Sequence, residues 1–378
     1  MRLTEVRFHN FRNHRLSNFS FSSNMNIIFG KNGQGKTNVL DGISYLCLTK
    51  GFLNSSDFSS IYFGETEFDI EAEFISDINI KSKVEIHFSN ITKSKSLFLD
   101  GLKVDRLISY IGLFPIVLLA PQYYCIVSGV PQDRRKFIDM VISQSSKSYL
   151  YDIMEYRKVL KQRNKLLSDI KLQQSNDFEG VTYWNGPLVK YGTSVIKKRY
   201  LFIKEFVPFF ERAYKEITLT KEEPVINYLP SIGTKDLNND FEYIEEIFER
   251  ELQNCMYDEY RRGSTLIGPH KDEIEFKINK VDVKQFASQG QQKTFLIALK
   301  IAEYFYLQDK CSEKPVLVLD DLFCELDKER SKLLLIFLKD KCQVFITSTS
   351  SDVFDEELDY SKMDGKFYVE EGQVQRIC

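Results

Sequence analysis

The sequence lacks the features that would place it in a membrane, in the secretory pathway or among zinc and disulfide proteins. No apolar run is long enough to span a bilayer, and residues 1–6 lack the apolar segment of a signal peptide. The seven cysteines include no C-x-x-C pair, and the four histidines lie far apart. We therefore expect a cytoplasmic protein with reduced thiols, without a zinc site and without contact to a membrane.

The chain also lacks a large excess of either charge. Its formal net charge is −3 and its pI is about 6.0, so nucleic-acid binding would need a local basic face. With 378 residues, of which 43% are hydrophobic, it can bury a sizeable core. We expect one large domain with an insertion, or two domains.

The pattern of apolar residues predicts an α/β fold with an inserted helical part. Alternation over 68–74, 84–88 and 97–104 indicates an antiparallel meander with one buried face. Long helices follow from about 146, and the second of them should be interrupted at Pro208. Strands return after Gly263, and no Pro- or Gly-rich linker separates the parts. We predict a head formed by 1–145 and 263–378, with a helical arm lobe at 146–262.

The most informative motif is a P-loop, G-x-x-x-x-G-K-[ST], between a strand-like run at 25–29 and a helix-like run after it. Its glycines let backbone N–H groups surround phosphate oxygens, Lys36 would reach the β- and γ-phosphates, and Thr37 would ligate Mg²⁺. A chance glycine-rich turn is the alternative. We predict a nucleotide triphosphate site formed by Gly30, Lys31, Asn32, Gly33, Gln34, Gly35, Lys36 and Thr37.

Two adjacent carboxylates follow an unbroken apolar strand at 316–319. We expect this strand to be the partner of the P-loop strand, which would place Asp320 to hold Mg²⁺ and Asp321 to position or deprotonate the attacking water. The alternative is a surface turn after a core strand. Lys36, Asp320 and Asp321 are the predicted catalytic residues.

The segment 288–292, Ser-Gln-Gly-Gln-Gln, begins an apolar helix. Its backbone N–H groups and the Ser288 hydroxyl, free at a helix N-terminus, would suit a γ-phosphate offered by another subunit. Ser288, Gly290 and Gln291 are therefore predicted to bind ATP. The order of P-loop, this segment, Asp-Asp strand and Glu325-Leu326-Asp327 is the one used by ABC-type ATPases.

Within that class the chain resembles the RecF family over nearly its whole length. The matching residues are Asn10 to Asn13, Gly33 to Asn38, Gly129 to Pro131, Arg134, Arg135, Asp139, Gln162 to Asn164, Gly268 to Asp272, Ala287 to Gln292, Asp320 to Leu322 and Glu325 to Asp327.

The resemblance implies an SMC-like ABC ATPase head, with a mixed sheet, an antiparallel β subdomain and a short helical arm. Two heads would sandwich two ATP molecules in an ATP-dependent homodimer. It also implies binding to duplex and to gapped or single-stranded DNA, action with a RecR-type mediator, indirect help to RecA at gaps, and a part in DNA repair, replication and the SOS response. Basic candidates for DNA contact are Arg134 to Lys136, Arg157 to Lys165, Lys197 to Arg199, Arg261 and Arg262, any of which can instead be solvated helix faces.

Some positions depart from the family pattern. Gln122-Tyr123 stands where an acidic pair is usual, and Gln122 is a candidate for the Mg²⁺-sensing glutamine of ABC proteins. Residues 51–54 lack the usual arginine. Thr347-Ser348-Thr349 stands where many ABC ATPases have a switch histidine. With Asp321 in place of a longer glutamate, we expect slow hydrolysis.

The sequence also leaves three other functions to consider. A GTPase is suggested by N-K-x-D at 279–282, but this motif precedes the Asp320 strand instead of following it. An ABC transporter subunit is disfavoured because the interval from Lys36 to Ser288 contains a helical lobe. A non-catalytic binding module is separated from an ATPase only by measured turnover.

Overall fold

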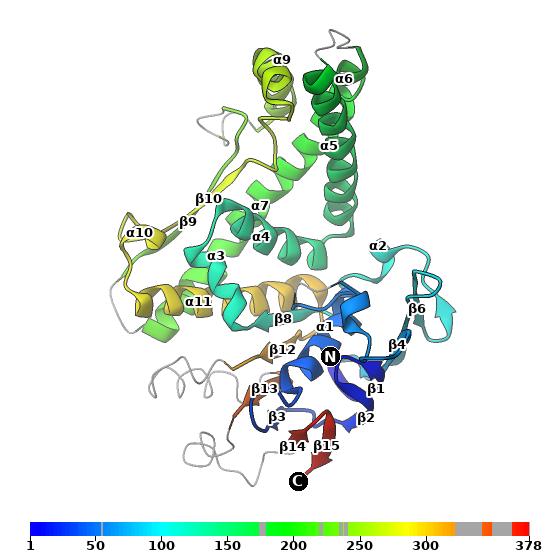
Figure 1. The fold of residues 1–378 in the computed structure, drawn as a ribbon. Coiled ribbons are helices and arrows are strands. Elements are labelled where there is room, and N and C mark those ends of the chain that lie inside the picture. Colours follow the sequence, from blue (N-terminus) through cyan, green and yellow to red (C-terminus); the bar gives the residue numbers. More distant parts are fainter. Residues whose placement is uncertain are drawn as a thin grey trace. The chain divides into compact units, whose positions relative to one another are not determined.

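The computed structural model describes residues 1–53, 56–173, 179–218, 222–233, 237, 241–321, 342–349 and 365–377. The chain divides into two compact units (Figure 1). The first comprises Met1–Tyr123 and Lys300–Cys378, and the second is Tyr124–Leu299. The second unit covers a longer stretch of the sequence than the helical lobe predicted at 146–262. Helices before residue 146, and strands and helices after residue 262, pack with that lobe. The division into a head and an arm lobe as functional domains stays a prediction.

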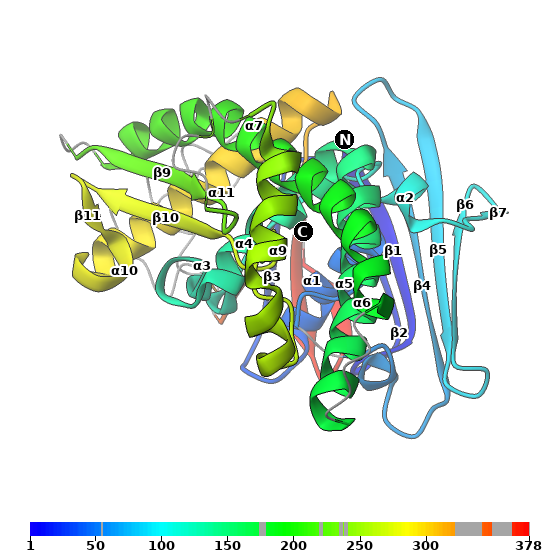
Figure 2. The same ribbon diagram turned by 90° about the horizontal axis from the view of Figure 1, so that it is seen from above.

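The first unit contains an antiparallel sheet (Figure 2), and one face of it is buried. Phe68, Ile70, Ala72 and Phe74 are buried while their neighbours along the strand are more exposed, which confirms the predicted meander. In spatial order the strands are β2 (His14–Ser20), β1 (Arg2–Phe11), β4 (Glu67–Ile75), β5 (Lys81–Ser89), β6 (Ser94–Leu99) and β7 (Leu102–Lys103).

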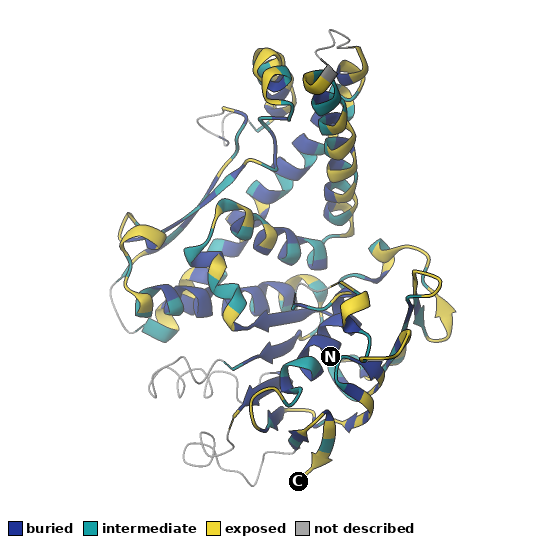
Figure 3. Ribbon diagram, in the orientation of Figure 1, coloured by how far each residue is buried: buried dark blue, intermediate teal, exposed yellow. Residues whose placement is uncertain are grey.

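A second sheet of the first unit carries the P-loop. Its strands are, in spatial order, β15 (Gln373–Arg376), β14 (Gly365–Glu370), β3 (Met25–Phe29), β13 (Val344–Ser348), β12 (Val316–Leu319) and β8 (Ile116–Leu119). All neighbours are parallel except the closing hairpin of β14 and β15. The central strands are buried, as Figure 3 shows.

One prediction about this sheet is wrong. The Asp320 strand β12 does not pair with the P-loop strand β3, because β13 lies between them. Unbroken apolar runs identify buried parallel strands, but runs that are equally apolar carry no information about their order.

The first unit also holds the helix that follows the P-loop. Helix α1 (Lys36–Leu48) begins at the last P-loop lysine, and Val39, Leu40, Ile43 and Leu46 are buried, as the helical spacing predicted. The remaining short elements of this unit are η1 (Phe58–Ser60), α2 (Leu107–Tyr110) and η2 (Pro121–Tyr124).

The second unit is mostly helical. Its helices are α3 (Cys125–Ser128), α4 (Pro131–Ser145), α5 (Lys147–Gln173), α6 (Glu179–Tyr183), α7 (Asn185–Thr218), α9 (Ile244–Arg262), α10 (Val283–Phe286) and the first part of α11 (Gln289–Cys311), which continues into the first unit. A three-stranded antiparallel sheet joins β11 (Val281–Asp282), β10 (Glu273–Ile278) and β9 (Pro224–Leu229). In the described part of the chain no helix is both long and apolar enough to cross a membrane.

Helix α7 is not interrupted at Pro208, contrary to the prediction. Proline removes one backbone hydrogen bond and costs a helix interior roughly 3 kcal/mol. The apolar face continues past it, since Phe202, Phe206, Phe210 and Tyr214 are all buried. Burial of each large side chain contributes about 1.5–3 kcal/mol, so the tertiary packing outweighs the local cost.

The N-K-x-D sequence is the connection between β10 and β11. Asn279 and Lys280 both have positive φ, 50° and 68°, as a two-residue hairpin turn requires. The Asn279 side chain accepts a hydrogen bond from the Glu223 N–H. The motif is therefore explained by its role in the hairpin turn, and guanine binding is not needed to account for it.

Candidate functional site

The P-loop has the curled backbone that its glycines allow. Gly30, Gly33 and Gly35 have φ values of 152°, 79° and 109°. A Cβ on Gly30 would lie 2.3 Å from the Val369 carbonyl oxygen, and one on Gly35 would lie 2.4 Å from the Asn13 side chain. A larger residue at either position would displace the loop.

Two segments that neighbour the P-loop in space hydrogen-bond to it and hold its backbone in place. The Asn13 amide donates to the Gln34 carbonyl at 2.9 Å and accepts from the Asn38 amide at 2.8 Å. The Gly372 N–H, in the β14–β15 turn, donates to the same Gln34 carbonyl at 3.1 Å. In the sequence Asn13 stood out only as part of a family motif, and this role was missed. The signal in the sequence that could have indicated this role is the position of Asn13 in the turn between β1 and β2.

Lys36 is buried and points back into the loop. Its ammonium donates to the carbonyls of Gly30 and Lys31 at 2.8 and 2.9 Å. Of the other predicted loop residues, Lys31, Asn32 and Gly33 are exposed. The two carbonyls are neutral acceptors, so a phosphate that entered the loop would offer Lys36 a stronger, charge-assisted partner.

Three residues distant in the sequence meet at the carboxyl end of the sheet. The Thr37 hydroxyl donates to Asp320 Oδ1 at 2.9 Å, and the Thr347 hydroxyl donates to the same oxygen at 2.7 Å. The Asp321 N–H donates to Thr347 Oγ1 at 3.0 Å. The structure thus brings together Thr37 and Asp320, as predicted, and adds Thr347 from the intervening strand.

The electrostatics of this corner suit a cation. Burial raises the pKa of Asp320, the hydrogen bonds from Thr347 and Thr37 oppose that shift, and the neighbouring Asp321 charge adds to it. Asp321 Oδ1 is buried and has no hydrogen-bond partner among the described residues. Hydroxyl and carboxylate oxygens are the ligands that Mg²⁺ prefers, so Thr37 and Asp320 fit the predicted metal.

Gln122 does not join this cluster in the structure. It follows β8 in η2, and its amide makes a long contact of 3.5 Å with the Phe52 carbonyl. No hydrogen bond links it to Thr37 or Asp320 in the described part of the chain. Leu322 and the segment 325–327 lie outside the described residues.

The segment 288–292 lies in the second unit, and its residues Ser288 and Gln291 are hydrogen-bonded to each other. The Gln291 N–H donates to Ser288 Oγ at 3.2 Å, and Gln291 Oε1 accepts from the Ser288 N–H at 2.9 Å. This is a capping box, readable from S-x-x-Q. The prediction that the Ser288 hydroxyl is free is therefore wrong. Because the hydroxyl accepts in this bond, its own proton remains available to a ligand. The Gln291 amide also donates to Glu222 at 2.9 Å.

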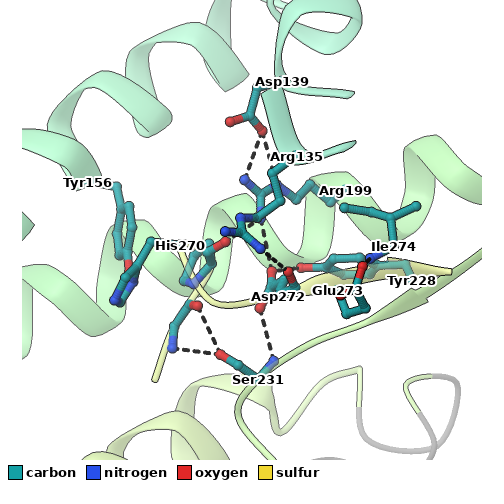
Figure 4. Close-up of polar contacts among 12 residues, drawn as sticks. Arg135, Asp139, Tyr156, Arg199, Tyr228, Ser231, His270, Asp272, Glu273 and Ile274 are labelled. Atoms are coloured by element: carbon teal, nitrogen blue, oxygen red, sulfur yellow. Dashed lines mark hydrogen bonds and ion pairs between the residues drawn. The ribbon is translucent and has the colours of Figure 1, made fainter. Parts of the chain in front are cut away.

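A buried ionic network occupies the second unit (Figure 4). Arg199 is 2% exposed and donates to Asp139 at 2.8 Å, Asp272 at 2.9 Å and the Pro269 carbonyl at 2.7 Å. Tyr228 and the Ser231 N–H donate to Asp272 from the small sheet and its loop. The Gly268–Asp272 motif is thus a structural joint between α4, α7 and β10.

This burial removes several arginines from the set of DNA contacts. Arg163 is fully buried and pairs with Glu259 at 2.6 Å, while Arg134 pairs with Glu273 at 2.8 Å. These two and Arg199 are buried partners of acidic residues, so they are neither DNA contacts nor the solvated helix faces that the sequence offered as the alternative.

His270 is also structural. Its Nε2 faces the Thr265 carbonyl at 3.1 Å and must donate, so Nδ1 accepts from the Tyr156 hydroxyl at 2.7 Å. Burial lowers the pKa of His270 to about 4, and nearby Lys271, Arg135 and Arg163 contribute. The imidazole is neutral at physiological pH.

Comparison with known proteins agrees with this geometry. Residues 2–375 match the family described as RecF/RecN/SMC N terminal domain. The chain is 39% identical over 359 residues to the DNA replication and repair protein RecF of Chloroherpeton thalassium, which covers 94% of this chain and 97% of that one.

Solved structures agree as well. The recombination mediator protein RecF-ATP of the RecFOR pathway matches with a TM-score of 0.90 and 30% identity, over 100% of this chain and 97% of that one. An Smc head bound to the C-winged helix domain of ScpA, at 12% identity and a TM-score of 0.57, over 100% of this chain and 97% of that one, shares the fold. The chain therefore belongs to the RecF family of SMC-like ABC-type ATPases, whose members are DNA replication and repair proteins.

Proposed function

We propose that this protein is an ATP-dependent DNA-binding clamp that dimerises on ATP, hydrolyses it slowly and acts in the repair of gapped DNA. The observation that carries the proposal is the corner formed by Thr37, Asp320 and an Asp321 oxygen that has no hydrogen-bond partner among the described residues, beside a formed P-loop. Duplex and gapped or single-stranded DNA, a RecR-type mediator and, indirectly, RecA are the proposed partners. Recombinase loading and the SOS response are the proposed context.

The residues of the chain account for each part of such a reaction. Lys36 and the loop N–H groups would bind the phosphates, and Thr37 with Asp320 would hold Mg²⁺, which neutralises phosphate charge when bound. The Asp321 carboxylate, one oxygen of which has no partner in the part of the chain that the structure describes, would orient the attacking water and accept its proton. Its short side chain supports slow turnover.

Dimerisation is the first test of the clamp. We expect the wild type to change from monomer to dimer on addition of ATP and Mg²⁺ in sedimentation experiments. Ser288→Arg should stay monomeric, because the larger cation removes the cap and fills the space for the partner's phosphate, yet it should bind ATP with wild-type affinity through its own P-loop. Gln285→Arg, which adds the same charge at an exposed position of α10, is the matched control. ATP-driven dimers of Ser288→Arg, or a wild type that remains monomeric with ATP and DNA, would contradict the clamp.

DNA binding is predicted to use the exposed face of α5 (Figure 3). Lys158, Lys161 and Lys165 are exposed at spacings of three and four residues, so they lie on one face of the helix. Lys158 has a loose ion pair with Glu155 at 3.6 Å. Such a row of ammonium groups can neutralise consecutive phosphates.

Changing these three lysines to glutamine should weaken duplex binding at least about tenfold, and should reduce the slope of log affinity against log salt by up to about 2.7. The control changes Lys81, Lys93 and Lys103, exposed on the β-meander, to glutamine. It removes the same charge and should leave affinity within about twofold. Equal losses in both triple variants would mean that net charge, not this face, determines binding.

A further inference from the structure

Thr347 lies between the two halves of the nucleotide site. It belongs to β13, which pairs with the P-loop strand β3 on one side and with the carboxylate strand β12 on the other. Ile346 pairs with Leu319, so Thr347 is level with Asp320. Its side chain is buried, with 1% exposure.

One hydroxyl serves both carboxylate residues. Thr347 Oγ1 donates to Asp320 Oδ1 at 2.7 Å and accepts from the Asp321 N–H at 3.0 Å. Only a side chain that both donates and accepts at a single atom makes this pair of bonds, which excludes valine, alanine and every charged residue.

The first bond selects which Asp320 oxygen faces a cation. Thr37 and Thr347 both donate to Oδ1, at 2.9 and 2.7 Å. With that oxygen occupied twice, Oδ2 is the oxygen left for a metal ion or its water. A carboxylate that is free to rotate would lose part of this orientation.

The second bond holds the backbone of Asp321, the residue proposed to orient the attacking water. Asp321 has a φ of 48°, in the left-handed region that aspartate enters more readily than most non-glycine residues but still at a cost in free energy. Its N–H bond to Thr347 offsets part of that cost, and the Asp321 side chain is then left with a buried oxygen that has no partner among the described residues.

We infer that Thr347 is a positioning residue for ATP hydrolysis, whose hydroxyl orients both Asp320 and Asp321 toward a metal-bound nucleotide. The inference rests on the proposed ATPase function and assigns a role to a position where the family resemblance indicated only a missing histidine. Thr347 touches neither phosphate nor water in this role; it acts through the two aspartates.

The test compares Thr347→Val, which keeps the shape and removes the hydroxyl, with Thr347→Ser, which keeps the hydroxyl. Thr193→Val is the matched control, because Thr193 Oγ1 is buried without a hydrogen-bond partner among the described residues. For each full-length variant we would measure kcat and KM, ATP affinity in EDTA with a fluorescent ATP analogue, and the gain in affinity caused by Mg²⁺.

Thr347→Val should bind ATP in EDTA within about twofold of wild type, since Lys36 and the loop are untouched. Loss of a hydrogen bond to a charged group should lower kcat about ten- to a hundredfold and reduce the Mg²⁺ gain about tenfold. Thr347→Ser should recover both to within about threefold, and Thr193→Val should match wild type.

Wild-type kcat and Mg²⁺ gain in Thr347→Val, or equal defects in the valine and serine variants, would overturn the inference. Parallel losses of kcat and of EDTA affinity would indicate a merely structural role and also overturn it. If the wild type itself hydrolyses no ATP, the proposed ATPase fails, and the Mg²⁺ gain still decides the role of Thr347. If the valine variant does not fold, Thr347→Ala takes its place.

Discussion

Lys36→Ala should abolish ATP hydrolysis and lower ATP affinity at least about a hundredfold. The Lys36 ammonium is buried in the loop and hydrogen-bonded to the Gly30 and Lys31 carbonyls at 2.8 and 2.9 Å. The other cation of the loop, Lys31, is exposed and is not placed to replace it. A charge-assisted bond to phosphate in a partly buried site contributes a few kcal/mol, and each 1.4 kcal/mol is a factor of ten. Titration with a fluorescent ATP analogue and a phosphate-release assay measure the two effects.

Lys31→Ala is the control for this experiment. It removes the same charge from the same loop, but its contribution to the site is the backbone carbonyl that Lys36 contacts. We expect ATP affinity within about threefold of wild type. If Lys31→Ala were as defective as Lys36→Ala, long-range charge would explain the binding. If Lys36→Ala bound ATP normally, the nucleotide site would have to lie elsewhere.

The sequence predicted the parts of the nucleotide site whose chemistry is local. The P-loop, its strand and its helix each depend on residues within a few positions of one another. The capping box at Ser288 is equally local, but it was not predicted. The contacts that complete the site are not local. Thr347 reaches Asp320 across 27 positions, and Asn13 reaches Gln34 across 21 positions. Both contacts depend on how the strands are ordered and joined, which equally apolar strands leave open.

The basic residues show a different limit of prediction from the sequence. Arg163 and Lys165 are two positions apart on α5, yet one is buried against Glu259 and the other is exposed. An arginine at a core-facing helical position looks in the sequence like an interruption of the apolar face. Its acidic partner comes from another helix, so the pair becomes visible only when the helices pack.

Arg199→Met is expected to destabilise the second unit by about 3–5 kcal/mol, the typical cost of leaving a buried charge without its partner. The change leaves Asp139 and Asp272 without the cation that lies 2.8 and 2.9 Å from them. Burial already raises the pKa of Asp272, and the Arg199 charge is the largest effect opposing that shift. Urea unfolding followed by tryptophan fluorescence measures the loss, because the single tryptophan, Trp184, lies in the second unit.

The pH dependence separates lost charge pairing from lost packing. Without Arg199 the pKa of Asp272 in the folded state should rise further above its unfolded value of about 3.9. For an acid with a raised folded pKa, stability falls as the pH rises above the unfolded pKa, because the folded state must then hold an unfavourable charge. The deficit of Arg199→Met should therefore be small near pH ~4 and grow toward pH ~7.

Arg157→Met supplies the contrast. Arg157 also contacts Asp139, at 2.9 Å, but its side chain is 60% exposed, so its loss should cost no more than about 1 kcal/mol. Adding Asp272→Asn to Arg199→Met should restore part of the stability, because the second change removes one of the stranded charges. A deficit in Arg199→Met that is constant with pH and not relieved by Asp272→Asn would show that the arginine contributes by packing alone. The network would then stabilise the second unit by the packing of its side chains and not by its ion pairs.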